Sequence, residues 1–313
     1  MISRFFEGTK PINYVVLLSF LFGFFVFRFY VESLQDQISI DFLNVGVSFI
    51  FLVLQIYLVN EIARKANLTE TSTFPLLFFI LLITAFSEVL LSSKLILSNF
   101  FVLLSVQEIL TVDTSKRNNF NFFNASFWIC IASIFYTSTI LFFIPILFSI
   151  FFYAANNLRN WLMPLAAIVA FSLISVSIGL LFSSSEFFRQ HYTILMPEGV
   201  FEEFNFESYT RLTLYVLANV ILLFIVFGRL RAIGKGRVLE LRMLFLFFIV
   251  GIILTLISLG PELGLGAILF TFCPVSLFIT NYFQIFRRKR LKEYVLLFVI
   301  IAPISISIWK LFS

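Results

Sequence analysis

Long hydrophobic runs recur from one end of this chain to the other, and they constrain its fold more than any other feature. Most of them exceed the 18 or so residues that a helix needs to cross a bilayer. Of the 313 residues, 60% are hydrophobic and 12% are charged, whereas soluble domains are about half apolar and a quarter charged. The runs therefore predict an all-α, polytopic membrane protein.

We expect about 11 transmembrane helices that form a single transmembrane helical domain over residues 1–313. The spans are predicted at residues 12–30, 41–60, 74–92, 95–112, 121–137, 139–154, 161–182, 210–228, 243–259, 264–284 and 293–311. Residues 121–154 are ambiguous, because one helix of that length would be about 50 Å long, well over the hydrocarbon thickness. We favour two short spans that meet near Thr137 to Thr139, with Pro145 distorting the second; a single span is the alternative.

The basic residues orient these spans. With the N-terminus in the cytoplasm, 17 of the 22 Lys and Arg residues fall in cytoplasmic segments, as the positive-inside rule predicts. The C-terminus then lies on the extracytoplasmic side. Because anchoring of short loops explains the basic clusters at 228–237 and 286–292, the net charge of +5 implies no nucleic-acid partner.

The outer segments are acidic where the inner ones are basic. The longest is residues 183–211, in which "VFEEFNFESYTRL" is typical of a short amphipathic helix. Its aromatic side chains would rest on the bilayer surface while its glutamates face water. We expect residues 183–209 to form an amphipathic lid over a cavity between the spans.

Glu88 is a carboxylate inside a hydrophobic run, where an unpaired charge costs on the order of 2.5–3.5 kcal/mol. In a span over residues 74–92 it would lie about 21 Å along the helix. Arg28 would lie about 24 Å along the first span, so the two depths match. We predict that Arg28 and Glu88 form an ion pair at the floor of an outward-open cavity, with Glu32 as a competing partner of Arg28. Glu108 is predicted near the cytoplasmic boundary, away from this level.

No motif identifies a reaction. The chain has one His and two Cys, so we expect no metal site and no cofactor. His191 has no neighbouring nucleophile motif such as GxSxG.

Residues 117–171 carry a resemblance. The stretch "RNNFNFFNASFWICIASIFYTSTILFFIPILFSIFFYAANNLRNWLMPLAAIVAF" has paired short apolar segments, a basic inner loop and a new span that begins at Trp-Leu. It resembles the corresponding part of GT-C-type membrane glycosyltransferases. The whole chain also resembles an uncharacterised family of polytopic inner-membrane proteins typical of Bacteroidota.

The GT-C resemblance implies a polyprenyl-phosphate-linked sugar donor at the outer face and a catalytic carboxylate in the first outer loop. That role would fall to Asp36, with Glu32 or Asp41 as alternatives, as general base on an acceptor hydroxyl. Arg28 or Arg189 would balance the lipid phosphate. The first loop here departs from the family, because it is several-fold shorter and lacks an adjacent acidic pair.

Three functions remain open for this bacterial inner-membrane, multi-pass protein. We favour a non-catalytic subunit or assembly factor of a cell-envelope complex, with membrane lipids and other envelope membrane proteins as partners. The alternative is a GT-C-like transferase or polymerase that uses a polyprenyl-phosphate lipid. A transporter is third, because we find no repeat between the halves. An outward-facing cavity lined by Glu32, Asp36 and Asp41 would favour the enzyme function. A sealed bundle filled with Phe side chains would favour the subunit function.

Overall fold

The described part of the chain is helical throughout. The computed structural model describes residues 5–8, 10–35, 42–65, 72–112, 119–181, 206–229, 235–258, 265–285, 292–297, 299–301 and 305, and none of these forms a β-strand. The α-helices are α2 (Pro11–Gln35), α3 (Phe42–Lys65), α4 (Phe74–Ala85), α5 (Ser93–Leu110), α6 (Asn119–Phe135), α7 (Phe143–Ala154), α8 (Leu158–Leu181), α10 (Phe206–Arg229), α11 (Lys235–Ile257) and α12 (Leu269–Ile285). Short 3₁₀-helices are η1 (Ser87–Leu91), η2 (Thr137–Phe142) and η4 (Gly266–Ile268). The predicted all-α class is confirmed.

Within the described ranges, six helices are long and apolar enough to cross a membrane. They are Pro11–Val31, Leu43–Lys65, Ser93–Leu110, Leu158–Leu181, Val238–Ile257 and Gly266–Gln284. Shorter apolar helices cover Phe74–Ala85, Phe120–Phe135, Thr137–Tyr153 and Thr210–Val226. The six long helices bear out a membrane protein with several spans, and the number eleven stays a prediction.

Residues 121–154 form two helices, as the length argument favoured. α6 ends at Phe135, and Tyr136 is extended, with φ −145° and ψ 104°. η2 follows, and α7 folds back against α6. Pro145 lies in the first turn of α7, where a missing N–H leaves no helical bond unmade. The break lies where it was predicted. The prediction that Pro145 distorts the second helix is wrong, because the residue lies in the first turn of α7, where proline is tolerated.

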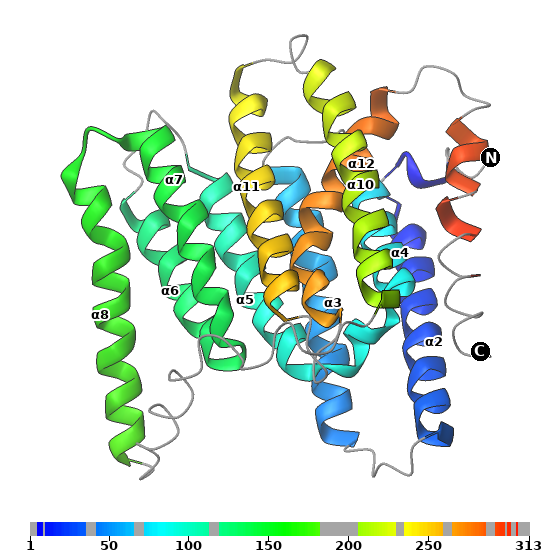
Figure 1. Ribbon diagram of the computed structural model, residues 1–313, viewed down its shortest axis with the longest axis horizontal. Helices are drawn as coiled ribbons and strands as arrows, with labels where there is room; N and C mark the ends of the chain where they lie inside the picture. Colours follow the sequence, from blue (N-terminus) through cyan, green and yellow to red (C-terminus); the bar gives the residue numbers. More distant parts are fainter. Residues whose placement is uncertain are drawn as a thin grey trace.

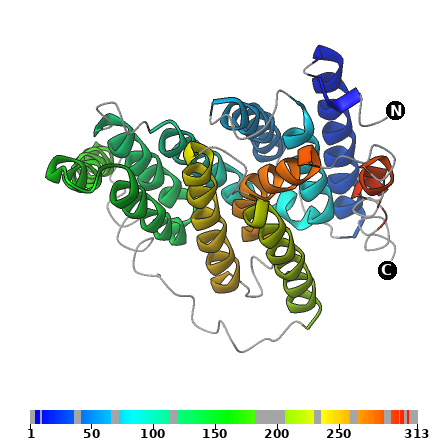
Figure 2. The ribbon, with the colours of Figure 1, turned by 90° about the horizontal axis from the view of Figure 1, so that it is seen from above.

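The centre of the bundle is formed by α4 and α12, which pack against each other (Figures 1 and 2). Ten of the twelve residues of α4 are buried, as expected of a helix that is apolar on every side. Phe78 and Phe283 pack with ring centroids 5.0 Å apart, and Phe79 meets Phe272 edge-on at 6.4 Å. The many phenylalanines thus fill the space between the central helices.

Buried amides join α3, α5 and α6. The Gln55 side-chain amide donates to the Ile96 carbonyl at 2.7 Å, and the Asn99 amide donates to the Gln55 Oε1 at 2.8 Å. The Ser98 hydroxyl donates to the Ala132 carbonyl at 2.9 Å. Hydrogen bonds of this kind hold helices together in a membrane, where the hydrophobic effect does not.

The helices alternate in direction, so their ends separate into two groups. In Figure 1 the starts of α2, α6, α8 and α11 lie at the top with the ends of α3, α7, α10 and α12. We call this the inner end, and the opposite end, where η1 lies, the outer end. Lys65, Arg159, Arg229 and Lys235 lie at or next to helix ends of the inner group. These helix ends show the clustering of basic residues that the sequence predicted.

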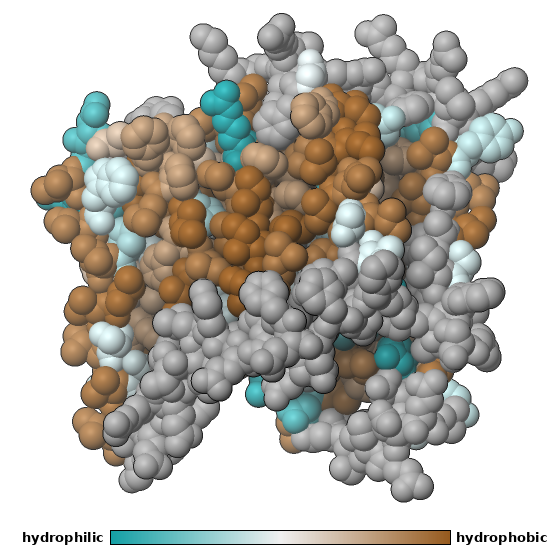
Figure 3. Space-filling model, viewed as in Figure 1, coloured by the Kyte–Doolittle hydropathy of each residue, from teal (hydrophilic) through white to brown (hydrophobic). Residues whose placement is uncertain are grey.

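The surface of the bundle is apolar, and α8 is its most exposed helix. α8 lies at one edge of the molecule, opposite α2 (Figure 2). Only 17% of its apolar window is buried, compared with 89% for the window in Gly266–Gln284. On the face drawn in Figure 3 the described residues are mostly hydrophobic. Such a surface is expected to contact lipid or other membrane helices.

Candidate functional site

Glu88 lies in a turn and not in a transmembrane helix. α4 ends at Ala85, and Phe86 leaves the helix with φ −115° and ψ 64°. Glu88 lies in η1, which ends at Leu91, and α5 starts at Ser93. The prediction of a continuous helix over residues 74–92 is therefore wrong. Its physical reason is that the apolar run continues through the turn, so hydropathy alone does not show where α4 stops.

The turn explains how a carboxylate fits into an apolar run. Glu88 Oε1 accepts a hydrogen bond from Arg211 Nη1 at 3.3 Å, and each side chain is 26% exposed. Arg211 lies near the start of α10, at the outer end. The charge of Glu88 is thus matched by an opposite charge and by partial exposure, which together lower the cost of placing it near the hydrocarbon.

Arg28 belongs to a helix beside this turn. It is on α2, its exposed fraction is 8%, and α2 packs against both α4 and η1. These helix contacts meet the condition that the proposed pairing requires, namely that the first span lies beside the segment with Glu88. The direct pairing of Arg28 with Glu88 remains a prediction, whereas Arg211 is a partner of Glu88 that the sequence argument missed. A signal for it existed, because Arg211 opens a predicted span at the outer side.

Aromatic and hydroxyl side chains close the space beneath the ion pair. The buried Tyr215 shares a hydrogen bond of 2.7 Å with the hydroxyl of Thr271 on α12. Phe86 meets the Tyr215 ring edge-on at 5.3 Å and the Phe272 ring at 5.9 Å. η1 also packs against η4, the buried start of α12. Among the described residues, packed side chains therefore fill the space around Tyr215 at the outer end.

Several predicted site residues fall outside the described residues. These are Asp36, Asp41 and Arg189, together with most of the predicted lid. Glu32 belongs to the last two turns of α2, and only its backbone is described. Residues 206–209 of the predicted lid are the first turn of α10. The proposed catalytic set Glu32, Asp36 and Asp41 is therefore still a prediction.

Glu108 lies at the other end of α5, as expected. Its side-chain Oε1 accepts from the Asn124 amide at 3.5 Å, and its carbonyl accepts from Asn121 at 3.3 Å. Glu88 and Glu108 therefore belong to different ends of the bundle. They do not share one site.

A second polar cluster ties the N-terminal segment to the start of α4. The Phe6 carbonyl accepts from the Thr73 backbone N–H at 3.0 Å and from the Thr73 hydroxyl at 3.1 Å. The buried Asn13 amide donates to the carbonyls of Phe5 and Gly8, each at 2.7 Å. These bonds fix the chain that precedes α2.

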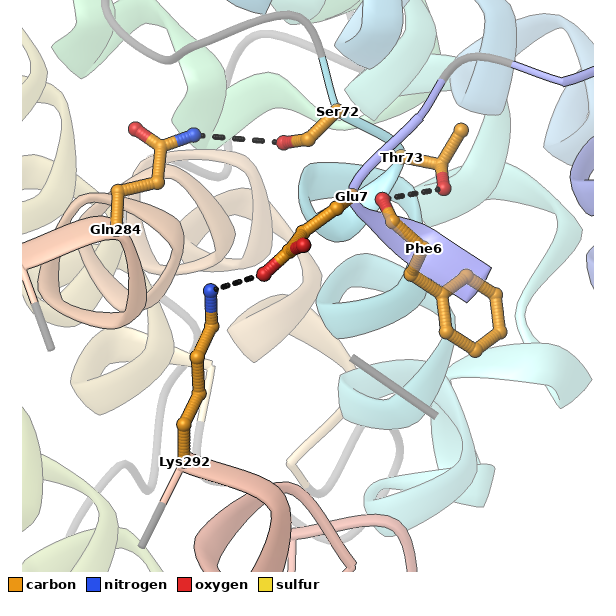
Figure 4. A network of polar contacts seen from close by, with 6 residues as sticks. All are labelled: Phe6, Glu7, Ser72, Thr73, Gln284 and Lys292. Carbon is orange, nitrogen blue, oxygen red and sulfur yellow. Dashed lines mark hydrogen bonds and ion pairs between the residues drawn. The ribbon is translucent and has the colours of Figure 1, made fainter. Parts of the chain in front are cut away.

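The same cluster reaches the end of the chain (Figure 4). Lys292 Nζ lies 2.9 Å from Glu7 Oε1 and 5.2 Å from the centre of the Phe74 ring. The Gln284 amide donates to the Ser72 hydroxyl at 3.4 Å. Segments that are far apart in sequence are thus joined at the inner end. The groups that meet here are already paired with one another, which is typical of a structural clamp.

An apolar cavity of about 480 Å³ lies at the edge of the bundle. Its walls are formed by α6, η2, the first residue of α7 and one face of α8. The lining residues are Cys130, Ser133, Ile140, Phe143, Ile168, Phe171, Ser172, Ser175, Val176, Gly179 and Leu180. We call it the α8 groove. It is remote in the fold from the Glu88–Arg211 pair, which lies among α2, α10 and α12.

The chemistry that these sites permit is limited. Among the residues that the structure describes, no three His, Cys, Asp or Glu side chains gather as a metal ion would require. Cys130 and Cys273 are both buried thiols in apolar surroundings. The Glu88–Arg211 pair supplies charge at the outer end of the bundle, and the α8 groove supplies apolar volume.

The chain was compared with known proteins. Residues 44–312 match the model of a family described as a family of unknown function, DUF6427. No curated protein and no solved structure matched the chain. Because the matched residues cover well over half of its length, the chain belongs to the DUF6427 family.

Proposed function

We propose that this protein is a non-catalytic subunit or assembly factor of a complex in the bacterial cell envelope. It would be a single multi-pass domain of the inner membrane with eleven spans, its N-terminus in the cytoplasm and its C-terminus outside. Its partners would be membrane lipids and other envelope membrane proteins. The protein would act through its membrane-facing surface.

The observation that carries this proposal is the packed interior. Phe74, Phe78, Phe79, Phe142, Phe247, Phe272 and Phe278 are all less than 2% exposed. The α8 groove opens at the side of the bundle, and its described lining contains no charged residue. Catalytic sites need convergent polar or titratable groups in a cavity. A filled core with an apolar groove at its edge fits a protein that binds within the membrane.

The runner-up is a GT-C-like transferase or polymerase that uses a polyprenyl-phosphate-linked sugar. The observation in its favour is the charge at the outer end, where Glu88 and Arg211 pair and α2 brings the buried Arg28 to the same region. In that case Asp36, Glu32 or Asp41 would act as the general base.

Complementation separates the two proposals. A strain that lacks the gene would receive the triple variant Glu32→Gln, Asp36→Asn and Asp41→Asn, which keeps side-chain size and removes the carboxylates. A subunit should complement fully at wild-type protein levels. Loss of complementation by a variant that still accumulates in the membrane would favour the enzyme.

A matched positive control is needed, because an assay insensitive to any change would also give full complementation. Ser175→Phe, which fills the α8 groove, serves this purpose, with Ser177→Phe on the opposite face of α8 as its partner. The subunit proposal expects Ser175→Phe to impair complementation and Ser177→Phe to leave it intact. The subunit proposal would be overturned if the triple variant at residues 32, 36 and 41 failed to complement while Ser175→Phe complemented fully.

A further inference from the structure

The α8 groove follows one face of α8 at regular spacing. The α8 residues that line it are 168, 171, 172, 175, 176, 179 and 180, a stripe with the three- and four-residue spacing of one helix face. All of them except residue 168 belong to the half of α8 nearer the outer end. The opposite wall comes from Cys130 and Ser133 of α6 and from Ile140 and Phe143. The groove is thus an elongated channel parallel to α8.

The hydroxyl groups in the groove are engaged with the backbone of their own helices. Ser133 donates to the Cys130 carbonyl at 2.7 Å, Ser172 to the Val169 carbonyl at 2.8 Å and Ser175 to the Ser172 carbonyl at 3.0 Å. Each hydroxyl has a single O–H, so no donor of these serines is left for a ligand. An ordered water needs about two to four polar partners. A polar ligand or a water cluster would therefore be poorly held here, and hydrocarbon fits.

The groove is long and wide enough for one extended hydrocarbon chain. The α8 residues that line it run from 168 to 180, and the twelve steps between them give a length of about 18 Å. A volume of about 480 Å³ spread over that length gives a mean cross-section of about 27 Å². A chain that lies parallel to α8 would therefore contact the whole lining stripe.

We propose that the α8 groove binds one acyl chain of a membrane phospholipid. The chain lies along α8, in contact with the small residues Ser172, Ser175 and Gly179, with its axis parallel to the helix. Binding removes an apolar cavity that would otherwise be empty, which costs stability through lost contacts. This inference names the occupant of the groove that the proposed subunit role uses, and its test measures lipid binding and not complementation.

The test uses the full-length protein in vesicles of phosphatidylethanolamine and phosphatidylglycerol, with a trace of phosphatidylglycerol that carries a diazirine midway along one acyl chain. After irradiation, adducts are mapped by mass spectrometry. Ser175→Phe places a ring in the groove. Ser177→Phe makes the same substitution about 200° around the helix, at an exposed position outside the lining.

In the wild type, adducts should concentrate on the groove-lining residues of α6 and α8. Ser175→Phe should reduce these adducts by about tenfold, equivalent to about 1.4 kcal/mol, and Ser177→Phe should leave them unchanged. As a second readout, adding phospholipid to delipidated protein should raise the Tm of the wild type and of Ser177→Phe more than that of Ser175→Phe. If Ser175→Phe fails to fold, Ser172→Leu takes its place.

Three results would overturn the proposal. Adducts spread evenly around α8 and unaffected by Ser175→Phe would mean ordinary surface lipid. Suppression of the groove adducts by a polyprenyl phosphate, but not by excess phospholipid, would assign the groove to an isoprenoid chain. A disulfide between Val176→Cys residues of two copies would show that a second molecule occupies it.

Discussion

The close approach of α11 and α12 at Gly251 leads to a quantitative prediction about packing. A Cβ atom at position 251 would lie 2.7 Å from Thr271 Cγ2 and 3.4 Å from the backbone N of Thr271. Thr271 has little freedom to move, because its hydroxyl bonds both Tyr215 and the Ile268 carbonyl, each at 2.7 Å. Gly251→Ala should therefore force the two helices apart or strain Thr271.

The magnitude follows from a matched comparison. Overpacking a core by one carbon costs about 1–3 kcal/mol, while Gly→Ala in a helix gains up to about 1 kcal/mol of intrinsic propensity. Gly23 and Gly46 are helical positions where a Cβ meets nothing within 4 Å. The propensity gain cancels between sites, so Gly251→Ala should be less stable than Gly23→Ala by about 1–3 kcal/mol.

A second substitution identifies the clashing atom. Thr271→Ser removes Cγ2 and keeps the hydroxyl that bonds Tyr215. In that background the penalty of Gly251→Ala should fall, with a coupling energy of about 0.5–3 kcal/mol. The assay is reversible unfolding of the full-length protein in mixed micelles, followed by circular dichroism. If Gly251→Ala matches Gly23→Ala, or if Thr271→Ser leaves its cost unchanged, the packing described for α11 and α12 is wrong.

Two further predictions concern polar pairs. For Glu88 and Arg211, which are each a quarter exposed, a double-mutant cycle with Glu88→Gln and Arg211→Gln in the same unfolding assay should give a coupling of only about 0.2–1 kcal/mol; a coupling near zero would mean that the pair does not form. For the buried Gln55 and Asn99, the cycle with Leu at both positions should give about 0.6–1.7 kcal/mol, and strictly additive losses would contradict the hydrogen bond between them.

The sequence predicted the class of fold because that class depends on the hydropathy of successive residues, which can be calculated directly from the sequence. The break near Thr137 was also predictable, since the length of the apolar run exceeds what one span can hold. The stop of α4 at Ala85 was not, because the residues around it remain apolar and tertiary packing decides where a helix ends in such a run. The charge of Glu88 was the local sign that the apolar run is interrupted. It could not be interpreted as a turn without knowing that α4 ends at Ala85.

The candidate site was predicted only in part, because the sequence shows how far along a span a residue lies but not which helices are neighbours. Depth along a span placed Arg28 and Glu88 at one end, and the contact of α2 with η1 agrees with this. Arg211, which the sequence argument did not name, is a partner of Glu88 and lies 123 residues further along the chain. Spatial neighbours of such separation follow from helix packing, which the pattern of hydrophobic residues does not specify. The α8 groove likewise depends on how α6, α7 and α8 meet.

The central claim is a polytopic protein whose basic end faces the cytoplasm. Its test needs a background without native thiols, and Cys130 and Cys273 are both buried. Conservative replacement by Ala or Ser at these two sites should be checked first by the unfolding assay. Single cysteines are then introduced one at a time and labelled in intact cells with a membrane-impermeant maleimide.

Cysteines at Gln35 and Leu195 should be labelled from outside. Those at Lys65, Lys235 and Lys289 should react only after the membrane is permeabilised. This pattern follows from the positive-inside rule and from the alternation of the helices. Labelling of Lys65, Lys235 or Lys289 positions in intact cells, or protection of the Gln35 or Leu195 position, would contradict the proposed topology.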